Sequence, residues 1–575
     1  MKRTSKRAVL LFSIIGLGIP GAYAQGGPGN GKHVLLISID GMHALDYENC
    51  VTKNTCPNMA SLGKHGVTYP RTSTSRPSDS FPGLMALVTG GSPKSVGAFY
   101  DVAYDRILAP PTIETGNGNP PGECNTGHPN GATTEYEEGN EIDQTQLNGG
   151  FMGYSLIDGG IKSIDPKKLN RDPLNNCNPV YAWNFVRTNS IYGVIHAHGG
   201  YTAWSDKHAA YASVNGHTNG VTPTNVDDYY SPEVNSNIIA LPAGTITAFG
   251  DNCSTILDPT GGDWTTSFIE IRCYDQLKVN AVLNWINGKT HLGGSNAPVP
   301  VIFGMNFQAV SVGQKLIEPG QPAGGYLNAA GEPAPSMLNE IEFVDMAIGQ
   351  MVTALRNQGL NDKTTIIITA KHGQSPVDVN RFFPIPGHSP LMNGASPTTI
   401  LFNNSPSLIA QTECEFLGGN PPCPAGVMGG LGPTEDDISL IWLKDSNNTV
   451  AAVNLLETKA NAAAAGIGQI FYGASITTNY NSPLTDSRTP DIIVAPNVGV
   501  VYTASAKKHS EHGGFANDDT NVMMLVSNPS INQTTDYSFV ETKQVAPTIL
   551  QILGLDPNAL DAVKLEGTTV LPGLF

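Results

Sequence analysis

Short runs of consecutive apolar residues that end in polar residues constrain the fold of this chain most. Val34 to Ile39 is such a run and ends in Asp40-Gly41. The stretch from Thr364 to Ile368 precedes Lys371 and His372, and residues 298–307 read "PVPVIFGMNF". Runs that are apolar on both faces are typical of strands buried inside a parallel sheet. The sequence therefore predicts a buried sheet with polar residues at its strand ends.

Segments with helical spacing separate these strands. We expect helices over 57–64, 82–89 and 337–358, a further strand near 67–71, and a helix at "VAPTILQILGL". "PDIIVAPNVGVVY" and "NVMMLVSN" each predict another strand of the same sheet. This alternation favours an α/β fold with a mostly parallel central sheet and helices on both faces.

Loop-rich segments interrupt the alternation of strands and helices, and they do not form a repeat. The chain contains 63 glycines and 42 prolines, many of them in these stretches. We interpret 25–575 as a single domain with insertions at about 112–180, 210–296 and 381–484.

The first 24 residues have the pattern of an export signal. Four basic residues precede a short apolar stretch and Ala22-Tyr23-Ala24, which predicts a signal peptide of residues 1–24, cut after Ala24. A membrane anchor is the alternative, but the apolar stretch is short for a span. We expect a secreted or periplasmic protein with no membrane span after signal removal.

Eight cysteines in an exported chain favour disulfides. Close spacing suggests Cys50 with Cys56, Cys253 with Cys273 and Cys414 with Cys423, which leaves Cys124 with Cys177. Spacing alone does not exclude other pairings.

The balance of charge limits the possible partners. With 32 basic and 49 acidic residues, the formal net charge is -17, which argues against binding to a nucleic-acid duplex. A phosphate substrate would need metal ions or lysines to offset the field of the protein.

Four polar residues fall where such sheets bind ligands, beyond the carboxyl ends of strands. They are Asp40, Ser80 before a helix, His372, and His512 in a glycine-bounded loop. Each has an ordinary explanation, since Asp and Ser often cap helices and single histidines are often structural. Together they indicate a functional site.

The ordered segments "SIDGM", "CPNMASLGKHGV", "SDSFPGLMALVTGG", "TAKHGQ", "PDIIV" and "EHGGF" resemble the alkaline phosphatase superfamily. The type I phosphodiesterase/nucleotide pyrophosphatase branch is the most similar, over most of 33–105, 298–380 and 488–575. The resemblance implies a small-molecule phosphate ester as substrate and one or two divalent metal ions, most simply Zn²⁺. It also implies roles for four residues: Ser80 as a nucleophile that touches metal, and Asp40, His372 and His512 as metal ligands.

Three positions depart from the family pattern. Lys371 stands where the family has an aspartate ligand. Gln308 and Gln314 are the nearest candidates where an Asp-x-x-Gly-His ligand pair should follow the "GMNF" strand. Asp101 replaces an asparagine that binds a phosphoryl oxygen, so we assign Asp101, Gln308 and Gln314 to substrate binding. Glutamine is a poor zinc ligand, which puts the second metal in doubt.

Three interpretations therefore compete. The first, which we favour, is a phosphodiester or pyrophosphate hydrolase in which Lys371 supplies part of the positive charge. The second is a sulfatase-like or phosphomonoesterase activity, although sulfatases need Cys/Ser-x-Pro-x-Arg and Leu84 occupies the arginine position. The third is a ligand-binding descendant without catalysis.

Two histidine-containing segments are ambiguous. Asp206, Lys207 and His208 either edge the site or form an exposed turn. His196 and His198 lie in an apolar pattern that we interpret as a strand with buried histidines.

Overall fold

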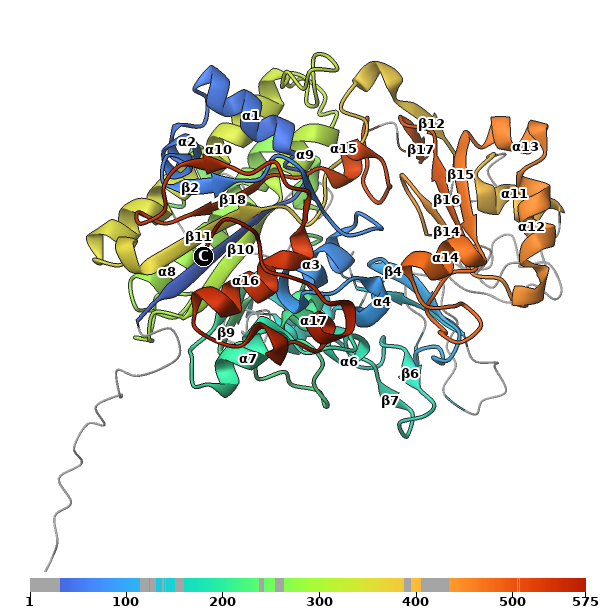
Figure 1. Ribbon diagram of the computed structural model, residues 1–575, viewed down its shortest axis with the longest axis horizontal. Coiled ribbons are helices and arrows are strands. Elements are labelled where there is room, and N and C mark those ends of the chain that lie inside the picture. Colours follow the sequence, from blue (N-terminus) through green and yellow to red (C-terminus); the bar gives the residue numbers. More distant parts are fainter. Residues whose placement is uncertain are drawn as a thin grey trace, which may run out of the picture.

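An eight-stranded sheet organises the chain in the computed structural model (Figure 1). The structure describes residues 31–113, 124, 131–136, 139, 141–149, 160–236, 242, 244–253, 263–386, 394–404, 434–503, 505 and 507–575. The strand order is β19-β2-β18-β11-β1-β10-β8-β9, and only β18 runs antiparallel to the others. The strands are β1 (His33–Ile39), β2 (Gly66–Thr68), β8 (Ala203–Ser205), β9 (Asp228–Tyr230), β10 (Ile302–Phe307), β11 (Thr364–Thr369), β18 (Met524–Ser527) and β19 (Thr534–Thr535).

Both faces of β1 are covered, as its unbroken apolar sequence predicts. Val34 and Leu36 pack into one hydrophobic cluster, while Leu35, Ile37 and Ile39 pack into another on the opposite face. Because side chains alternate along a strand, an apolar residue at every position requires a helical layer on each side.

The two helical layers match this requirement (Figure 1). On one face, the first cluster packs around α3 (Ser80–Thr89), α7 (Ile191–Ala197) and α16 (Val545–Ile552). On the other face, the second cluster is built from α1 (Ala44–Lys53), α2 (Pro57–Gly63), α8 (Phe268–Ile286), α9 (Ala309–Lys315) and α10 (Pro335–Asn357). The predicted α/β fold with a mostly parallel sheet and helices on both faces is confirmed.

A second, smaller sheet lies to one side of the central sheet (Figure 1). Its four antiparallel strands are β13 (Thr434–Glu435), β14 (Ser439–Ile441), β16 (Ile492–Pro496) and β15 (Ile467–Tyr472). The helices α11 (Pro397–Asn404), α12 (Thr449–Leu456), α13 (Lys459–Ala464) and α14 (Ala474–Asn479) lie beside it. The prediction that the "PDIIV" strand joins the central sheet is wrong, because β16 pairs with β14 and β15 instead.

The structure describes three of the four expected disulfides. Disulfides join Cys50 to Cys56, Cys124 to Cys177 and Cys253 to Cys273. The predicted signal peptide and the pair Cys414–Cys423 lie outside the described residues. Among the described residues, none of the helices combines the length and hydrophobicity that crossing a membrane requires.

The expectation for His196 and His198 is wrong. His196 lies in the last turn of α7, with its side chain 40% exposed, and His198 caps the end of that helix. Ser190 caps the start of α7, and Gly199 follows its end with a positive φ. A start signal and a stop signal for a helix therefore outweigh the strand-like composition between them.

Candidate functional site

The carboxyl ends of three neighbouring strands bring the candidate residues together. β1 lies between β10 and β11 and is parallel to both. Asp40 follows β1, Lys371 and His372 lie just after β11, and Asn306 is near the end of β10. Because these ends meet at one edge of the sheet, residues far apart in sequence share a site.

The carboxylate of Asp40 is the centre of this group and is fully buried. Burial alone would raise its pKa, but the positive charges of Lys371 and His372 outweigh burial and hold the pKa well below its usual range. Five donors surround its Oδ2 atom: Gln308 Nε2 at 2.7 Å, Asn306 Nδ2 at 3.1 Å, Lys371 Nζ at 3.3 Å, Ser80 Oγ at 3.4 Å and His372 Nε2 at 3.5 Å.

Lys371 is held between two carboxylates. Its Nζ atom lies 3.3 Å from Asp40 Oδ2 and 3.2 Å from Asp206 Oδ1, and none of the three side chains is more than 1% exposed. The ammonium also lies 4.6 Å from the centre of the Tyr211 ring. Asp206 in turn accepts from Trp204 Nε1 at 3.0 Å, so the lysine is fixed rather than mobile. Asp40 therefore already has a buried cation at ion-pair distance.

Ser80 is the first residue of α3 and points toward Asp40. The helix cap is Asp79, whose Oδ2 accepts from the backbone nitrogens of Phe81 at 2.9 Å and Asp101 at 3.0 Å. The Ser80 hydroxyl is therefore not used as a cap. Asp101 is buried beside this cap, and its own Oδ1 accepts from the nitrogen of Val102.

The two histidines lie side by side. The ring centres of His372 and His512 are 4.1 Å apart. His372 Nδ1 lies 2.8 Å from the carbonyl oxygen of Gly373, which can only accept, so Nδ1 is a donor there, while Nε2 faces Asp40. His512 Nδ1 lies 3.8 Å from Asp79 Oδ1.

The two glutamines take different positions. Gln308 reaches Asp40, and its backbone nitrogen donates to buried Asp275 at 2.8 Å, which fixes the start of α9. Gln314 instead donates to the carbonyl oxygen of Gly41 and to the hydroxyl of Tyr326, both at 2.7 Å. At Gly41, where φ is +82°, a Cβ would meet Gln314 Oε1 at 2.2 Å, so only glycine fits. Gln314 thus lies behind the turn that follows β1, apart from the Asp40 cluster.

The arrangement does not fit a two-metal centre. Within the ranges that the structure describes, no group of three or more His, Cys, Asp and Glu side chains could hold a metal ion. Asp40 Oδ2 is already surrounded by N–H and O–H donors, and the lysine brings a positive charge to this carboxylate. Among the described residues, Asp40 Oδ1 and the neighbouring Asn306 Oδ1 are buried without a hydrogen-bond partner, so both are acceptors left for an added group.

Two residues of the cluster were missed or left open by the sequence reading. The sequence places Asp206 where it could edge the site, but an exposed turn accounts for the same residues equally well. Asn306 gave no separate signal, because it lies inside an apolar run. Only the pairing of β10 with β1 and β8 shows that both residues reach the same site.

Comparisons with known proteins agree with this fold. The profile of the type I phosphodiesterase/nucleotide pyrophosphatase family matches residues 34–129 and 318–518, more than half of the chain. These ranges contain Asp40, Ser80, Asp101, Lys371, His372 and His512. A search of curated protein sequences found no significant match.

Solved structures of one mammalian enzyme share the architecture. Murine ectonucleotide pyrophosphatase/phosphodiesterase 5, free and as an inactive variant in complex with AMP, aligns with a TM-score of 0.50 at 14% identity. Each alignment covers 92% of this chain and 96% of the murine chain. The human protein of the same name aligns with a TM-score of 0.48 at 13% identity, over 91% and 95% of the two chains.

At this identity the structures establish the fold, while the family profile covers the ends of β1 and β11 and the start of α3, but not the ends of β8 and β10. The chain belongs to the type I phosphodiesterase/nucleotide pyrophosphatase family of the alkaline phosphatase superfamily.

Proposed function

We propose that this protein hydrolyses small phosphodiesters or pyrophosphates, with Ser80 as the nucleophile and Lys371 as a fixed positive charge. The observation that carries the proposal is that Ser80 Oγ and Lys371 Nζ both lie against Asp40 Oδ2, at 3.4 and 3.3 Å. The start of α3 and the ammonium of Lys371 are the parts of this cluster that attract an anionic phosphoryl group, although Lys371 is shared with the carboxylates of Asp40 and Asp206.

The chain's own residues divide the chemistry. Ser80 Oγ attacks phosphorus, the bond to the leaving oxygen breaks, and water then attacks the phosphoserine and restores the hydroxyl. The proton that Ser80 releases balances the proton that the leaving oxygen takes up. Because the pKa of Asp40 is held well below its usual range, Asp40 orients the Ser80 hydroxyl rather than deprotonating it. Phosphoryl transfer makes little demand for a base, since its transition state is loose.

Lys371 would offset the negative charge that spreads over the phosphoryl oxygens. Zinc is the metal that the family resemblance suggests, but the residues around Asp40 do not offer a two-metal ligand set, so no step is assigned to a metal ion. Asp101, buried beside the Asp79 cap, would oppose a dianionic monoester more than a monoanionic diester.

Two features weigh against the sulfatase alternative. It requires an arginine at the position of Leu84, and Leu84 is fully buried in the hydrophobic cluster under α3. A guanidinium there would be desolvated among apolar side chains.

The test compares the purified protein with Ser80→Ala on a nitrophenyl phosphodiester, phosphomonoester and sulfate. We expect the diester to be the best substrate, and Ser80→Ala to reduce its rate by at least about a thousandfold. Ser78→Ala is the matched control, because this buried serine donates to a backbone carbonyl of Asp519 and not to Asp40. Equal rates for Ser80→Ala and the native protein would remove the nucleophile assignment.

Burial favours a second candidate, a ligand-binding protein without turnover. Asp40, Ser80, Lys371 and Asp206 are all fully buried, so a substrate must displace neighbouring groups to reach them. No turnover of any of the three esters would support this candidate.

We also propose that the protein is exported. The basic and apolar amino-terminal sequence and the three disulfides support an oxidising compartment, either outside the cell or in a periplasm.

A further inference from the structure

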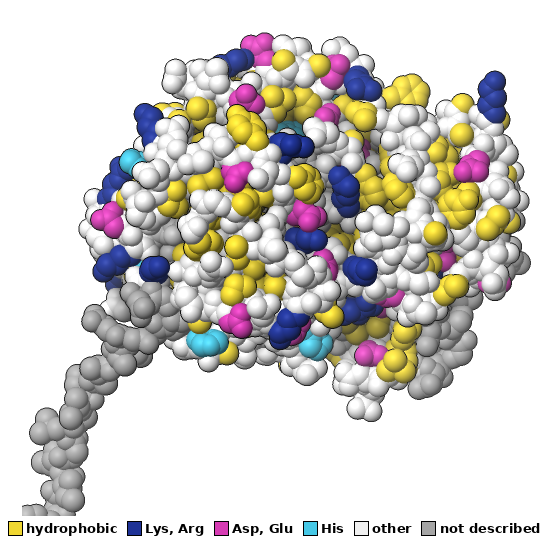
Figure 2. All heavy atoms as spheres, in the orientation of Figure 1, with side chains coloured by type: hydrophobic (Ala, Val, Ile, Leu, Met, Phe, Trp, Pro, Cys, Tyr) yellow, Lys and Arg dark blue, Asp and Glu magenta, His cyan; other side chains and the backbone are white. Residues whose placement is uncertain are grey.

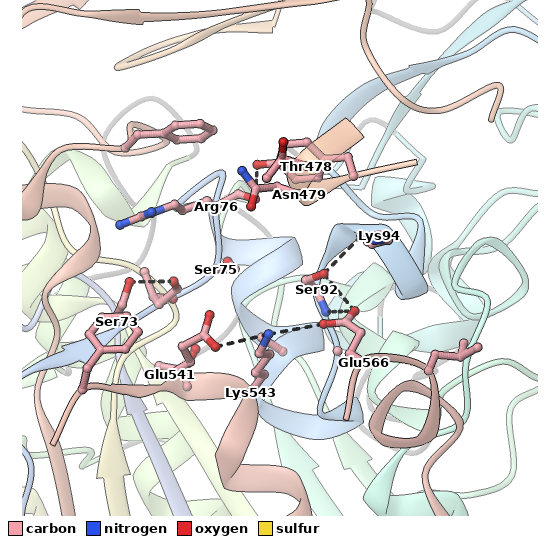
Figure 3. Close-up of a pocket in the computed structure, with 18 of the residues that line it drawn as sticks. Ser73, Ser75, Arg76, Ser92, Lys94, Thr478, Asn479, Glu541, Lys543 and Glu566 are labelled. Atoms are coloured by element: carbon pink, nitrogen blue, oxygen red, sulfur yellow. Dashed lines mark hydrogen bonds and ion pairs between the residues drawn. The ribbon is translucent and has the colours of Figure 1, made fainter. Parts of the chain in front are cut away.

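A cavity of about 440 Å³ lies beside α3, with Ala86 of this helix in its lining. Figure 3 shows Arg76 and Asn479 along one side, Glu541 and Lys543 along the opposite side, and Ser92 with Glu566 toward one end. Its walls come from the segment before α3, the end of α3, the small sheet with α14, and the carboxyl-terminal region around α17 (Asp561–Glu566). The volume is in the range of small-molecule sites.

This cavity is separate from the candidate active site. Its lining includes none of Asp40, Ser80, Lys371, His372 and His512. One link is Thr74, which lines the cavity and whose hydroxyl donates to the backbone carbonyl of Lys371. A ligand in the cavity would therefore not depend on chemistry at Ser80.

The acidic residues of the cavity are already neutralised by the protein. Lys543 Nζ lies 3.2 Å from Glu541 Oε2 and 3.3 Å from Glu566 Oε2. Glu566 Oε1 also accepts from the nitrogen and hydroxyl of Ser92, both at 2.8 Å, and from the hydroxyl of Ser95 at 2.6 Å. These donors lower the pKa of Glu566 although burial opposes them, so the carboxylate is charged and satisfied without a ligand.

Two further cations of the cavity do not pair with a carboxylate among the described residues. Arg76 and Lys94 both line it, and neither forms an ion pair with any residue that the structure describes. Adding these cations to Lys543, Glu541 and Glu566 gives the lining a formal charge of +1, in a chain whose net charge is -17. Figure 2 shows Lys and Arg side chains gathered near the middle of this face, over the region where Figure 1 places α3 and α4 (Pro93–Val96). The cavity is thus a positive site on an acidic protein, which favours an anion.

Aromatic side chains supply the other half of a binding site. Phe471 and Phe515 line the cavity with their ring centres 5.4 Å apart, and Phe539 lines it with 61% of its surface exposed. A phenylalanine exposed to this degree gains free energy if a planar apolar group covers it. Ser73 and Ser75 stand on the same lining as Arg76, and their hydroxyls donate to the backbone carbonyls of Thr74 at 3.2 Å and Pro77 at 3.0 Å, so each must rotate to donate to a phosphoryl oxygen.

We propose that this cavity binds a small organic phosphate or phosphonate that carries an aromatic ring, with the anion attracted by the positive charges of Arg76 and Lys94 and the ring against the phenylalanines. A guanidinium recognises the fork of oxygens on such an anion, and an ammonium adds a point charge.

Calorimetric titration with phenylphosphonate tests the proposal, because its carbon–phosphorus bond cannot be hydrolysed as an ester. We expect binding to the native full-length protein, and at least about tenfold weaker binding to the double variant Arg76→Gln/Lys94→Gln. Both side chains are exposed, so the variant is expected to fold. Arg71→Gln is the matched control, since this exposed arginine lies five residues before Arg76 and does not line the cavity.

Each result decides the proposal. It is supported if phenylphosphonate binds to the native protein and to Arg71→Gln but binds poorly to the double variant. It is overturned if nothing binds up to about 10 mM, or if the double variant binds as well as the native protein. Inorganic phosphate binding as tightly as phenylphosphonate would overturn the part played by the aromatic ring. Loss of ester hydrolysis in Ser80→Ala with phenylphosphonate binding retained would show that the two sites are independent.

Discussion

Lys371 sets the character of the candidate site at the scale of single residues. The family resemblance leads to the expectation of an aspartate here, so a lysine changes the local charge by two units, and it forms ion pairs with Asp40 and Asp206. The lysine could be recognised in the sequence, but its partner Asp206 lies 165 residues earlier in the chain. Only the parallel packing of β8, β10, β1 and β11 brings the two together.

Replacing Lys371 should lower the stability of the folded protein as well as its activity. We expect Lys371→Met to lower the free energy of unfolding by about 3 to 5 kcal/mol, because it leaves two buried carboxylates without their cation. Adding Asp206→Asn should recover part of that loss, since one of the uncompensated charges is then gone. Urea unfolding of the native protein, both single variants and the double variant measures this coupling.

Lys363→Met is the control, because this exposed lysine contacts neither carboxylate. A loss below about 1 kcal/mol in Lys371→Met, or a purely additive double variant, would contradict the buried ion-pair arrangement.

At the scale of elements, a buried pair of carboxyl groups joins the small sheet to the loop that carries His512. Asp437 lies in the turn between β13 and β14, and Asp519 lies in α15 (Asn517–Thr520). Between them, a Cβ at Gly514 would meet Asp519 Oδ2 at 2.2 Å, so the loop after His512 passes directly over the pair. Burial is the main cause that raises the pKa of Asp519 to about 7, and burial with the charge of Asp519 raises the pKa of Asp437.

This pair predicts a stability that falls as the pH rises. The folded pKa of Asp519 is above its usual value near 4, so between about pH 4 and 7 the folded state holds a proton that the unfolded state has released. Stability from this group is therefore greatest below about pH 4 and is lost toward pH 7. His43, whose pKa is raised to about 8, loses its contribution only above about pH 6.5, and Glu511, lowered to about 2, acts below about pH 4.5.

The measurement is the urea midpoint of the native protein and Asp519→Asn from pH 4 to 8. The variant should show a clearly flatter decline between pH 4.5 and 6.5, where the other two groups contribute little slope. Asp561→Asn is the control, as this exposed aspartate starts α17 far from the pair. Parallel curves for the native protein and Asp519→Asn would contradict a protonated pair.

For the whole molecule, the metal content follows from how many potential metal ligands the site offers and how many donor groups already surround them. The described residues offer Asp40, His372 and His512 near one another, but a lysine and donor amides fill the positions around Asp40. We expect fewer than about one tightly bound zinc ion per chain, and an ester-hydrolysis rate that changes less than about twofold after dialysis against a chelator.

Elemental analysis of the purified protein, before and after dialysis, gives the metal count directly. Two zinc ions per chain, with activity lost on chelation and restored by zinc, would contradict the role given to Lys371 and would return the metal to the mechanism. Lys371→Asp extends the test, because it restores the family residue and should raise the affinity for zinc if the charge at this position decides binding.

The sequence by itself determined the layers of this protein, because strands that are apolar at every position are buried between two layers of helices. Glycine and capping residues also mark where the helices end. It also determined which side chains stand at two strand ends, since Asp40 follows β1 directly and Lys371 and His372 follow β11 after Ala370. Tertiary structure alone decided what those side chains touch. The pairing of Lys371 with Asp206, the approach of Asn306 to Asp40, the placement of Gln314 behind Gly41 and the transfer of β16 to the second sheet all depend on contacts between distant segments. Local periodicity cannot encode such contacts, because they arise only from the order in which the strands pair.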